Sequence, residues 1–120
     1  MTDAKLTFAI ALKRWFAANG WPQLITDEWA KDDGIKYPHG PWASQICAVL
    51  KGDKYNPRAE FFIAIAVFNQ FVADGDFKSI KKSILKERLR DSKPFTNDLG
   101  EVYGPGDFWM LYAGLHSPPE

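Results

Sequence analysis

The sequence predicts an all-α domain, and three observations lead to this fold class. Apolar residues recur three and four positions apart in segments 8–16, 43–50 and 61–72, as they do along one face of a helix. Glycines directly follow such segments and prolines precede others, which is where helices commonly end and begin. The 120 residues, 46% of them hydrophobic and 25% charged, are enough for a single globular domain with one core.

Two helices are predicted in the N-terminal part. The first covers 3–19 and ends at Gly20, and basic residues inside its apolar pattern mark it as amphipathic rather than a signal peptide. Its buried stripe consists of Phe8, Leu12, Trp15 and Phe16. The second helix covers 23–33, follows Pro22 and ends at Gly34. Its inward residues are Ile25, Trp29 and Ala30.

The middle of the chain predicts a short helix, a loop and a longer helix. The short helix over 42–51 is followed by Gly52, and Asn56 can cap a helix over 57–73 that opens with Pro57. The inner face of the short helix is expected to consist of Ala43, Ile46, Cys47 and Leu50. Its other face carries Ser44, Gln45, Ala48 and Lys51, and we expect the Gln45 side chain to be exposed.

The residues SQI, VLKG, NP and FF-AIA between positions 44 and 66 resemble the second half of the phage-repressor-like helix-turn-helix domain, the Cro and XRE type. In that family a short recognition helix ends at a glycine and a proline opens the next helix. The resemblance covers the middle of the chain. It implies a compact five-helix, lambda-repressor-like core over 1–75, double-stranded DNA as partner, and a homodimer.

The resemblance also implies a DNA-contacting surface. Ser44, Gln45 and Ala48 would face base edges, since Gln can pair with adenine and Ala can touch a thymine methyl group. Residues expected at phosphates or in the neighbouring loop are Lys36, Tyr37, His39, Lys51, Lys54 and Arg58. Two features depart from the family. Asp27 stands where a phosphate-contacting Gln is common, and segment 35–41, either a DNA-contacting wing or a simple surface loop, enlarges the turn.

The longer helix over 57–73 carries two apolar stripes on nearly opposite sides. The first consists of Phe61, Ile65, Phe68 and Val72, and the second of Ile63, Val67 and Phe71. A helix that is apolar on two sides is expected to be buried on both, so the second stripe should meet the C-terminal region or a second subunit. Asn69 beside the first stripe is expected to be a hydrogen-bonded core amide.

Segment 76–120 is predicted as a C-terminal extension packed on the same core. A helix capped by Asp76 is expected over 77–90, with Phe77, Ile80 and Ile84 inside. Its basic row of Lys78, Lys82, Lys86 and Arg90 is either a solvated face or a contact for phosphates or an acidic partner. Residues 76–93 hold seven Lys or Arg and three Asp or Glu, a net charge of +4.

The last part of the extension is rich in aromatic residues. A loop follows position 92, with or without a short β-hairpin around 101–103. Asp107 can then cap a short helix over 108–113 that ends before Gly114. Phe108, Trp109 and Tyr112 are expected to meet the second stripe of the chain, a second subunit or another protein.

Two functions remain open on these grounds: a DNA-binding transcriptional regulator, and a protein-binding adaptor or inhibitor that keeps the helical core. A formal net charge of +0 favours the adaptor, because DNA-binding domains usually carry a basic excess. No catalytic, metal or cofactor site is predicted, and Cys47 is expected to be a buried structural thiol. The single cysteine and the absence of a long apolar run favour a cytoplasmic protein without a membrane partner.

Overall fold

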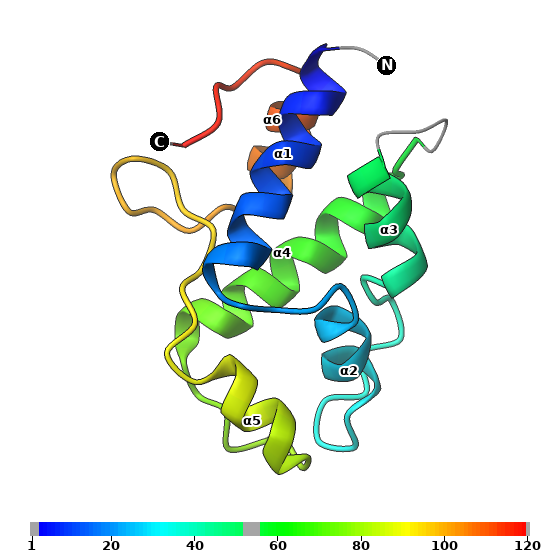
Figure 1. The fold of residues 1–120 in the computed structure, drawn as a ribbon, viewed down its shortest axis with the longest axis vertical. Coiled ribbons are helices and arrows are strands. Elements are labelled where there is room, and N and C mark those ends of the chain that lie inside the picture. Colours follow the sequence, from blue (N-terminus) through cyan, green and yellow to red (C-terminus); the bar gives the residue numbers. More distant parts are fainter. Residues whose placement is uncertain (1–2, 52–55, 120) are drawn as a thin grey trace.

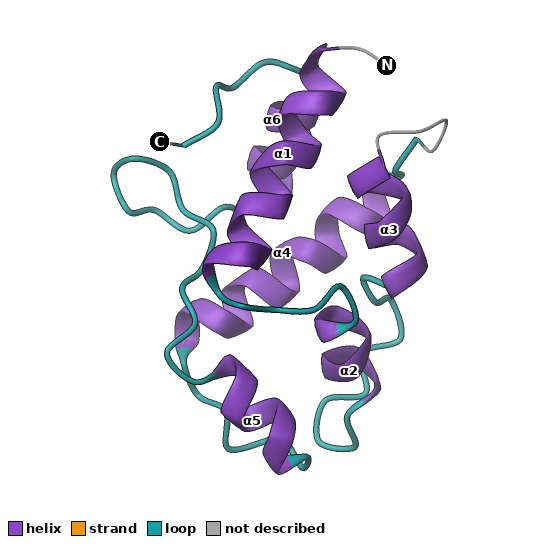
Figure 2. Cartoon of the chain, viewed as in Figure 1, coloured by secondary structure: helices purple, strands orange, loops and turns teal. Residues whose placement is uncertain are grey.

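The computed structural model describes residues 3–51 and 56–119, which form six α-helices and no strand. The helices are α1 (Asp3–Ala18), α2 (Ile25–Lys31), α3 (Ala43–Lys51), α4 (Ala59–Asp74), α5 (Ser83–Leu89) and α6 (Pro105–Tyr112) (Figures 1 and 2). The predicted all-α class is therefore confirmed. Of the short β-hairpin, the described residues contain one antiparallel bridge, between Thr96 and Val102.

The helices are arranged around α4, which runs through the middle of the molecule behind α1 (Figure 1). α6 packs against both α1 and α4, although nearly the whole chain separates it from α1. α3 packs against α1 and α2, and α5 packs against α2. The loop between α5 and α6 passes along the side of α1 that is turned away from α3 (Figure 1).

Aromatic rings fill the core, as the apolar spacing of α1 and α4 predicts. The expected stripe of α1 is buried, and so is the first stripe of α4. Trp15 makes edge-to-face ring contacts with Trp21 and Phe95, at centroid distances of 5.2 and 5.6 Å. Phe68 packs on Trp21 and Trp29 at 5.4 Å in both cases. Such offset ring pairs stabilise a core beyond the area that they bury.

Asn69 is the buried core amide that the sequence predicts. Its Nδ2 group donates to the carbonyl oxygens of Phe95 and Tyr103 at 2.9 and 3.1 Å. Its Oδ1 atom accepts from the Phe95 backbone N–H at 2.7 Å. One side chain of α4 thereby joins both arms of the loop between α5 and α6 to the core.

The predicted helix over 77–90 is too long at its start. α5 begins at Ser83, because the buried Asp32 carboxylate binds the chain just before it. Asp32 Oδ1 accepts from the Lys81 and Gly34 backbone N–H groups, and Oδ2 accepts from that of Lys82 at 3.0 Å. Those amides meet a carboxylate instead of a helical carbonyl. Inside α5 the buried residues are Leu85 and Leu89, whereas the expected inner residue Ile84 is 68% exposed.

Several predicted helix ends also need correction. α4 begins at Ala59 rather than at Pro57, and the Asn56 side chain accepts from Lys5 Nζ at 2.6 Å instead of capping. Asp107 lies inside the first turn of α6, where its carboxylate accepts from the Gly104 backbone N–H at 2.8 Å. The predicted end at Gly52 lies outside the described residues.

Gly34 does not end α2 by adopting a left-handed conformation. The helix stops at Lys31, and a Cβ atom at position 34 would lie 1.5 Å from the Ser79 carbonyl oxygen. The glycine is needed because the chain before α5 passes directly over it. By contrast, Gly75 follows α4 with φ +67, a conformation that glycine adopts without steric cost.

Candidate functional site

The junction of α2 and α3 is the candidate nucleic-acid interface that the sequence singles out. The Asp27 carboxylate, on α2, accepts a hydrogen bond from the Ala43 backbone N–H in the first turn of α3. Asp27 also forms an ion pair with Lys31 at 2.8 Å. Partial burial alone would raise the pKa of Asp27, but the Lys31 ammonium and the Ala43 N–H outweigh it, so the pKa lies below its ordinary value. A negative charge at a helix N-terminus is electrostatically favourable.

Sequence reasoning missed this role of Asp27. In the sequence Asp27 stands out only as a departure from the phosphate-contacting Gln of the family, whereas in the structure it binds the start of the candidate recognition helix. The contact spans 16 positions, so no local capping pattern could predict it. The sequence offers only two features that point to this contact. The residue at the start of α3 is uncharged, and the preceding helix contains an acidic residue.

The faces of α3 are partly as predicted. Ile46 and Leu50 are buried and Ser44 is exposed, while Ala48 is half-buried. Val49 takes the buried place expected of Cys47, and Cys47 is partly exposed. The inner face is therefore rotated toward Val49, and α3 packs against both α1 and α2 rather than against a single neighbour.

Gln45 is half-buried, which corrects the expectation of an exposed side chain. Its Oε1 atom accepts from the Trp42 backbone N–H at 2.9 Å, as in the second half of a capping box. A bidentate contact with adenine needs both the oxygen and the nitrogen of the amide. Such a contact would have to share the Gln45 oxygen with the Trp42 N–H, which restricts the orientation of the amide.

Of the three candidate contacts in the enlarged turn 35–41, two are exposed and one is half-buried. Lys36 and His39 are exposed, and Lys36 has a left-handed backbone with φ 49. Tyr37 is half-buried and its ring lies 5.5 Å from that of Trp29. Tyr37 therefore packs on α2, and Lys36 and His39 are the exposed candidates of the turn.

Two predicted phosphate contacts lie near the ends of α3 and α4. Lys51 and Arg58 are both exposed, whereas Lys54 lies outside the described residues. Arg58 and Gln45 line the same hollow of about 320 Å³, together with Asn56, Glu60 and Phe61. A cation from the start of α4 is thus placed beside the first turn of α3.

The predicted basic row does not lie along one helix. Lys78 belongs to the turn before α5, Lys82 flanks its N-terminus, and only Lys86 lies inside it. Lys78, Lys86 and Arg90 instead line a hollow of about 280 Å³ with Gly75 and Phe77, and Lys82 is not part of it. Arg90 also pairs with Glu87 at 3.4 Å.

The candidate apolar interface separates into buried and exposed parts. Phe108 is fully buried between Trp15, Phe95 and Tyr103, so it belongs to the core. Tyr112 and Phe71 are half-buried against other rings of the chain. Ile63 and Val67 are 47% and 37% exposed, and Trp109 is 49% exposed. The expectation that both sides of α4 are buried is wrong within this chain.

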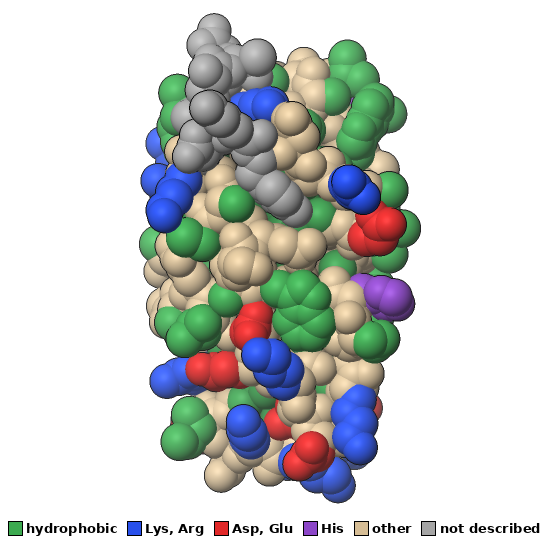
Figure 3. All heavy atoms as spheres, turned by 90° about the vertical axis from the view of Figure 1, so that its right-hand side faces the viewer, with side chains coloured by type: hydrophobic (Ala, Val, Ile, Leu, Met, Phe, Trp, Pro, Cys, Tyr) green, Lys and Arg blue, Asp and Glu red, His purple; other side chains and the backbone are tan. Residues whose placement is uncertain are grey.

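The face that carries α2 and α3 has mixed charge. In Figure 3, Lys and Arg side chains in its lower part alternate with Asp and Glu side chains. Within residues 3–51 and 56–119, no group of three or more His, Cys, Asp or Glu residues could hold a metal ion. No helix of the same residues is long and apolar enough to cross a membrane.

Comparison with known protein families finds one family whose pattern matches almost the whole chain. A family described as "Domain of unknown function (DUF8644)" matches residues 1–114. No curated protein and no solved structure matches the chain.

Proposed function

This chain belongs to the DUF8644 family, and from that premise we propose that it is a DNA-binding regulator of the helix-turn-helix type that reads DNA with α3. The observation that carries the proposal is the link from the Asp27 carboxylate to the Ala43 N–H. That contact links two consecutive helices that pack against each other. Presentation of one rigid helix from such a pair is how helix-turn-helix proteins enter the major groove.

In this proposal Ser44 and Ala48 approach base edges, because they lie on the side of α3 away from Ile46 and Leu50. Gln45 contributes through its amide NH2 group, since its oxygen is engaged with the Trp42 backbone. The residue then reads a single acceptor rather than pairing bidentately with adenine.

Phosphate contacts come from exposed cations on either side of α3. Arg58 lies beside Gln45 in the same hollow, and Lys51 ends the helix. Lys36 and His39 add exposed donors from the enlarged turn. The net charge of +0 means that such local cations, and not the protein as a whole, attract DNA.

The experiment is fluorescence anisotropy with a duplex selected from a random-sequence library and with an unselected pool. Arg58→Ala should weaken both complexes and lower the salt slope by about one. Ser44→Ala should weaken only the selected duplex. Lys13→Ala, at an exposed position on α1, is the matched control and should change neither.

Two results would reject the proposal. One is the absence of salt-dependent binding to any duplex. The other is an equal effect of the Lys13 and Arg58 substitutions, which would mean that charge acts without a defined surface.

The adaptor function is the second candidate, and the exposed pair Ile63 and Val67 favours it. The two side chains stand one turn apart on α4, and large apolar side chains gathered on a surface often mark protein contacts. The same surface could serve the proposed homodimer. Light scattering across a range of concentrations distinguishes the two uses. If the surface forms a homodimer, the parent protein should be dimeric and Val67→Glu should be monomeric. A parent protein that is monomeric and binds no DNA would favour the adaptor.

A further inference from the structure

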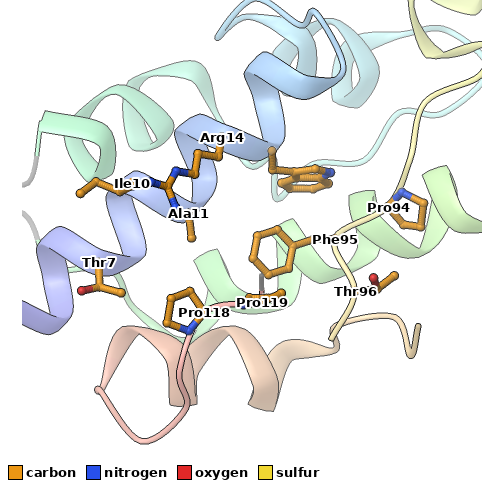
Figure 4. Close-up of a pocket in the computed structure, with 10 residues that line it drawn as sticks. Thr7, Ile10, Ala11, Arg14, Pro94, Phe95, Thr96, Pro118 and Pro119 are labelled. Atoms are coloured by element: carbon orange, nitrogen blue, oxygen red, sulfur yellow. The ribbon is translucent and has the colours of Figure 1, made fainter. Parts of the chain in front are cut away.

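A hollow of about 510 Å³ lies between α1, the segment 94–96 and the C-terminal residues 118 and 119 (Figure 4). It is lined by Thr7, Ile10, Ala11, Arg14, Trp15, Pro94, Phe95, Thr96, Pro118 and Pro119. We infer that this hollow binds a small organic carboxylate with a flat apolar body, and that Arg14 holds the carboxylate. Its volume lies within the range of small-molecule sites, roughly 300–1,000 Å³.

The wall formed by α1 follows from helical spacing. Thr7, Ala11 and Arg14 stand four and three positions apart and therefore share one face, with Ile10 and Trp15 on either side. Segment 94–96 forms the second wall, and the Phe95 ring lies in edge contact with that of Trp15 at 5.6 Å. Aromatic rings and prolines suit a flat apolar body better than a sugar or a free phosphate.

The opposite wall is held in place before any ligand binds. Trp15 Nε1 donates to the Lys93 carbonyl oxygen at 2.9 Å, and the Lys93 N–H donates to Asn19 Oδ1 at 2.8 Å. Asn69 binds both the N–H and the carbonyl group of Phe95. Segment 93–95 is therefore fixed to α1 and α4, which reduces the ordering cost of binding.

Arg14 supplies the charge that selects the ligand. It is the one charged residue among those that line the hollow in the described part of the chain. In Figure 4 its side chain extends along α1 past Ala11, at the rim of the hollow. A planar guanidinium group matches a carboxylate with two parallel hydrogen bonds, whereas a phosphate dianion would leave charge unpaired at this single cation.

The inference does not depend on the proposed DNA binding. α3 packs on one side of α1, and the loop that carries segment 94–96 passes on the other (Figure 1). A ligand in the hollow would touch none of the residues proposed to approach DNA. Failure of either idea therefore leaves the other standing.

The test uses the full chain and two probes with the same rings, 1-naphthoate and the uncharged 1-naphthalenemethanol. In calorimetric titration, naphthoate should bind at least tenfold more tightly than the alcohol. Amide shifts in a two-dimensional NMR spectrum should map naphthoate to Thr7, Ala11 and Thr96. Arg14→Gln should reduce naphthoate affinity to that of the alcohol, while the adjacent Lys13→Gln should leave it unchanged.

Ile10→Glu gives a second, independent variant at a half-exposed position. Its carboxylate should repel naphthoate and weaken its binding, while the affinity for the alcohol should stay unchanged. Unchanged melting temperatures should accompany both variants, because residues 10 and 14 are exposed. Equal affinity for acid and alcohol, equal loss in the two Gln variants, or no shift at residues 7, 11 and 96 would each overturn the inference.

Discussion

The carboxylate of Asp27 lies within hydrogen-bonding distance of the backbone N–H of Ala43, so α2 supplies the acceptor that α3 lacks at its own start. Asp27→Ala removes that acceptor and should cost about 1–2 kcal/mol of unfolding free energy, as other losses of a helix cap do. Asp27→Asn keeps an oxygen and should cost less. Urea unfolding measures both.

Lys31→Ala is the control for this pair. It removes the ion pair with Asp27 and the contact of the Lys31 ammonium group with the Trp42 ring, 5.8 Å from the ring centroid, which together are worth roughly 1 kcal/mol or less. If Lys31→Ala proved as costly as Asp27→Ala, the ion pair rather than the backbone contact would hold the helices together.

Asp32→Asn should destabilise the protein although the two side chains have the same shape. Asp32 Oδ2 accepts from the Lys82 N–H, and an amide NH2 group there would place two donors face to face. We expect a loss of about 1–3 kcal/mol in urea unfolding. Asp33→Asn, at an exposed neighbouring position, should change stability by less than about 0.5 kcal/mol.

Stability should fall in acid because of the same two carboxylates. Burial alone would raise the pKa of Asp32, but the N–H groups of Lys81, Gly34 and Lys82 outweigh it and the pKa is lowered, as it is for Asp27. A lowered pKa contributes stability above the unfolded value of 3.8, and that stability is lost as the pH falls through the folded pKa. Urea midpoints measured from neutral pH to about pH 2 should show a steeper fall for the parent than for Asp32→Asn.

Asn69→Leu should loosen the loop between α5 and α6 more than its size suggests. The change removes the partner of the buried Phe95 N–H and that of the Tyr103 carbonyl group, whereas the Phe95 carbonyl still accepts from the Tyr103 N–H at 3.0 Å. We expect a cost of about 1–3 kcal/mol for the site. Hydrogen exchange at the Phe95 amide should accelerate. Gln70→Leu, on the exposed side of the same helix, is the control, and equal acceleration in both variants would contradict the role of Asn69.

Gly34→Ala and Gly106→Ala should have opposite effects. The new Cβ atom at position 34 would overlap the Ser79 carbonyl oxygen, so we expect a loss of about 2 kcal/mol or more. At position 106, inside α6, nothing lies within 4 Å of the new atom. Alanine there should gain about 0.4–1 kcal/mol. Thermal melting distinguishes the two, and a neutral Gly34→Ala would mean that the chain before α5 can move away.

Local patterns predict the helices of this chain well and their ends less well. Apolar spacing was sufficient for the buried faces of α1 and α4, because a side chain three or four positions away shares the same face. The predicted start of α5 was wrong because Asp32, far away in sequence, accepts hydrogen bonds from the N–H groups of Lys81 and Lys82. The pattern at Phe77 and Lys78 predicts a helix, but this long-range contact keeps the chain before α5 out of the helical conformation.

The candidate site shows the same limit. The exposure of Ser44 follows from its spacing on α3, but the engagement of Gln45 with Trp42 depends on where the helix begins. The hollow at Arg14 could not be predicted at all. Its walls come from α1, a loop near position 95 and the C-terminal prolines, which no sequence pattern connects.

The packing of α6 on α1 has a consequence for synthesis at the ribosome. Phe8 and Phe62 contact each other and both contact Tyr112, so the part of each ring that Tyr112 covers stays exposed until α6 has been made. At typical elongation rates the interval between the two helices is on the order of 10 s. The nascent chain therefore exposes this part of its aromatic surface for that time.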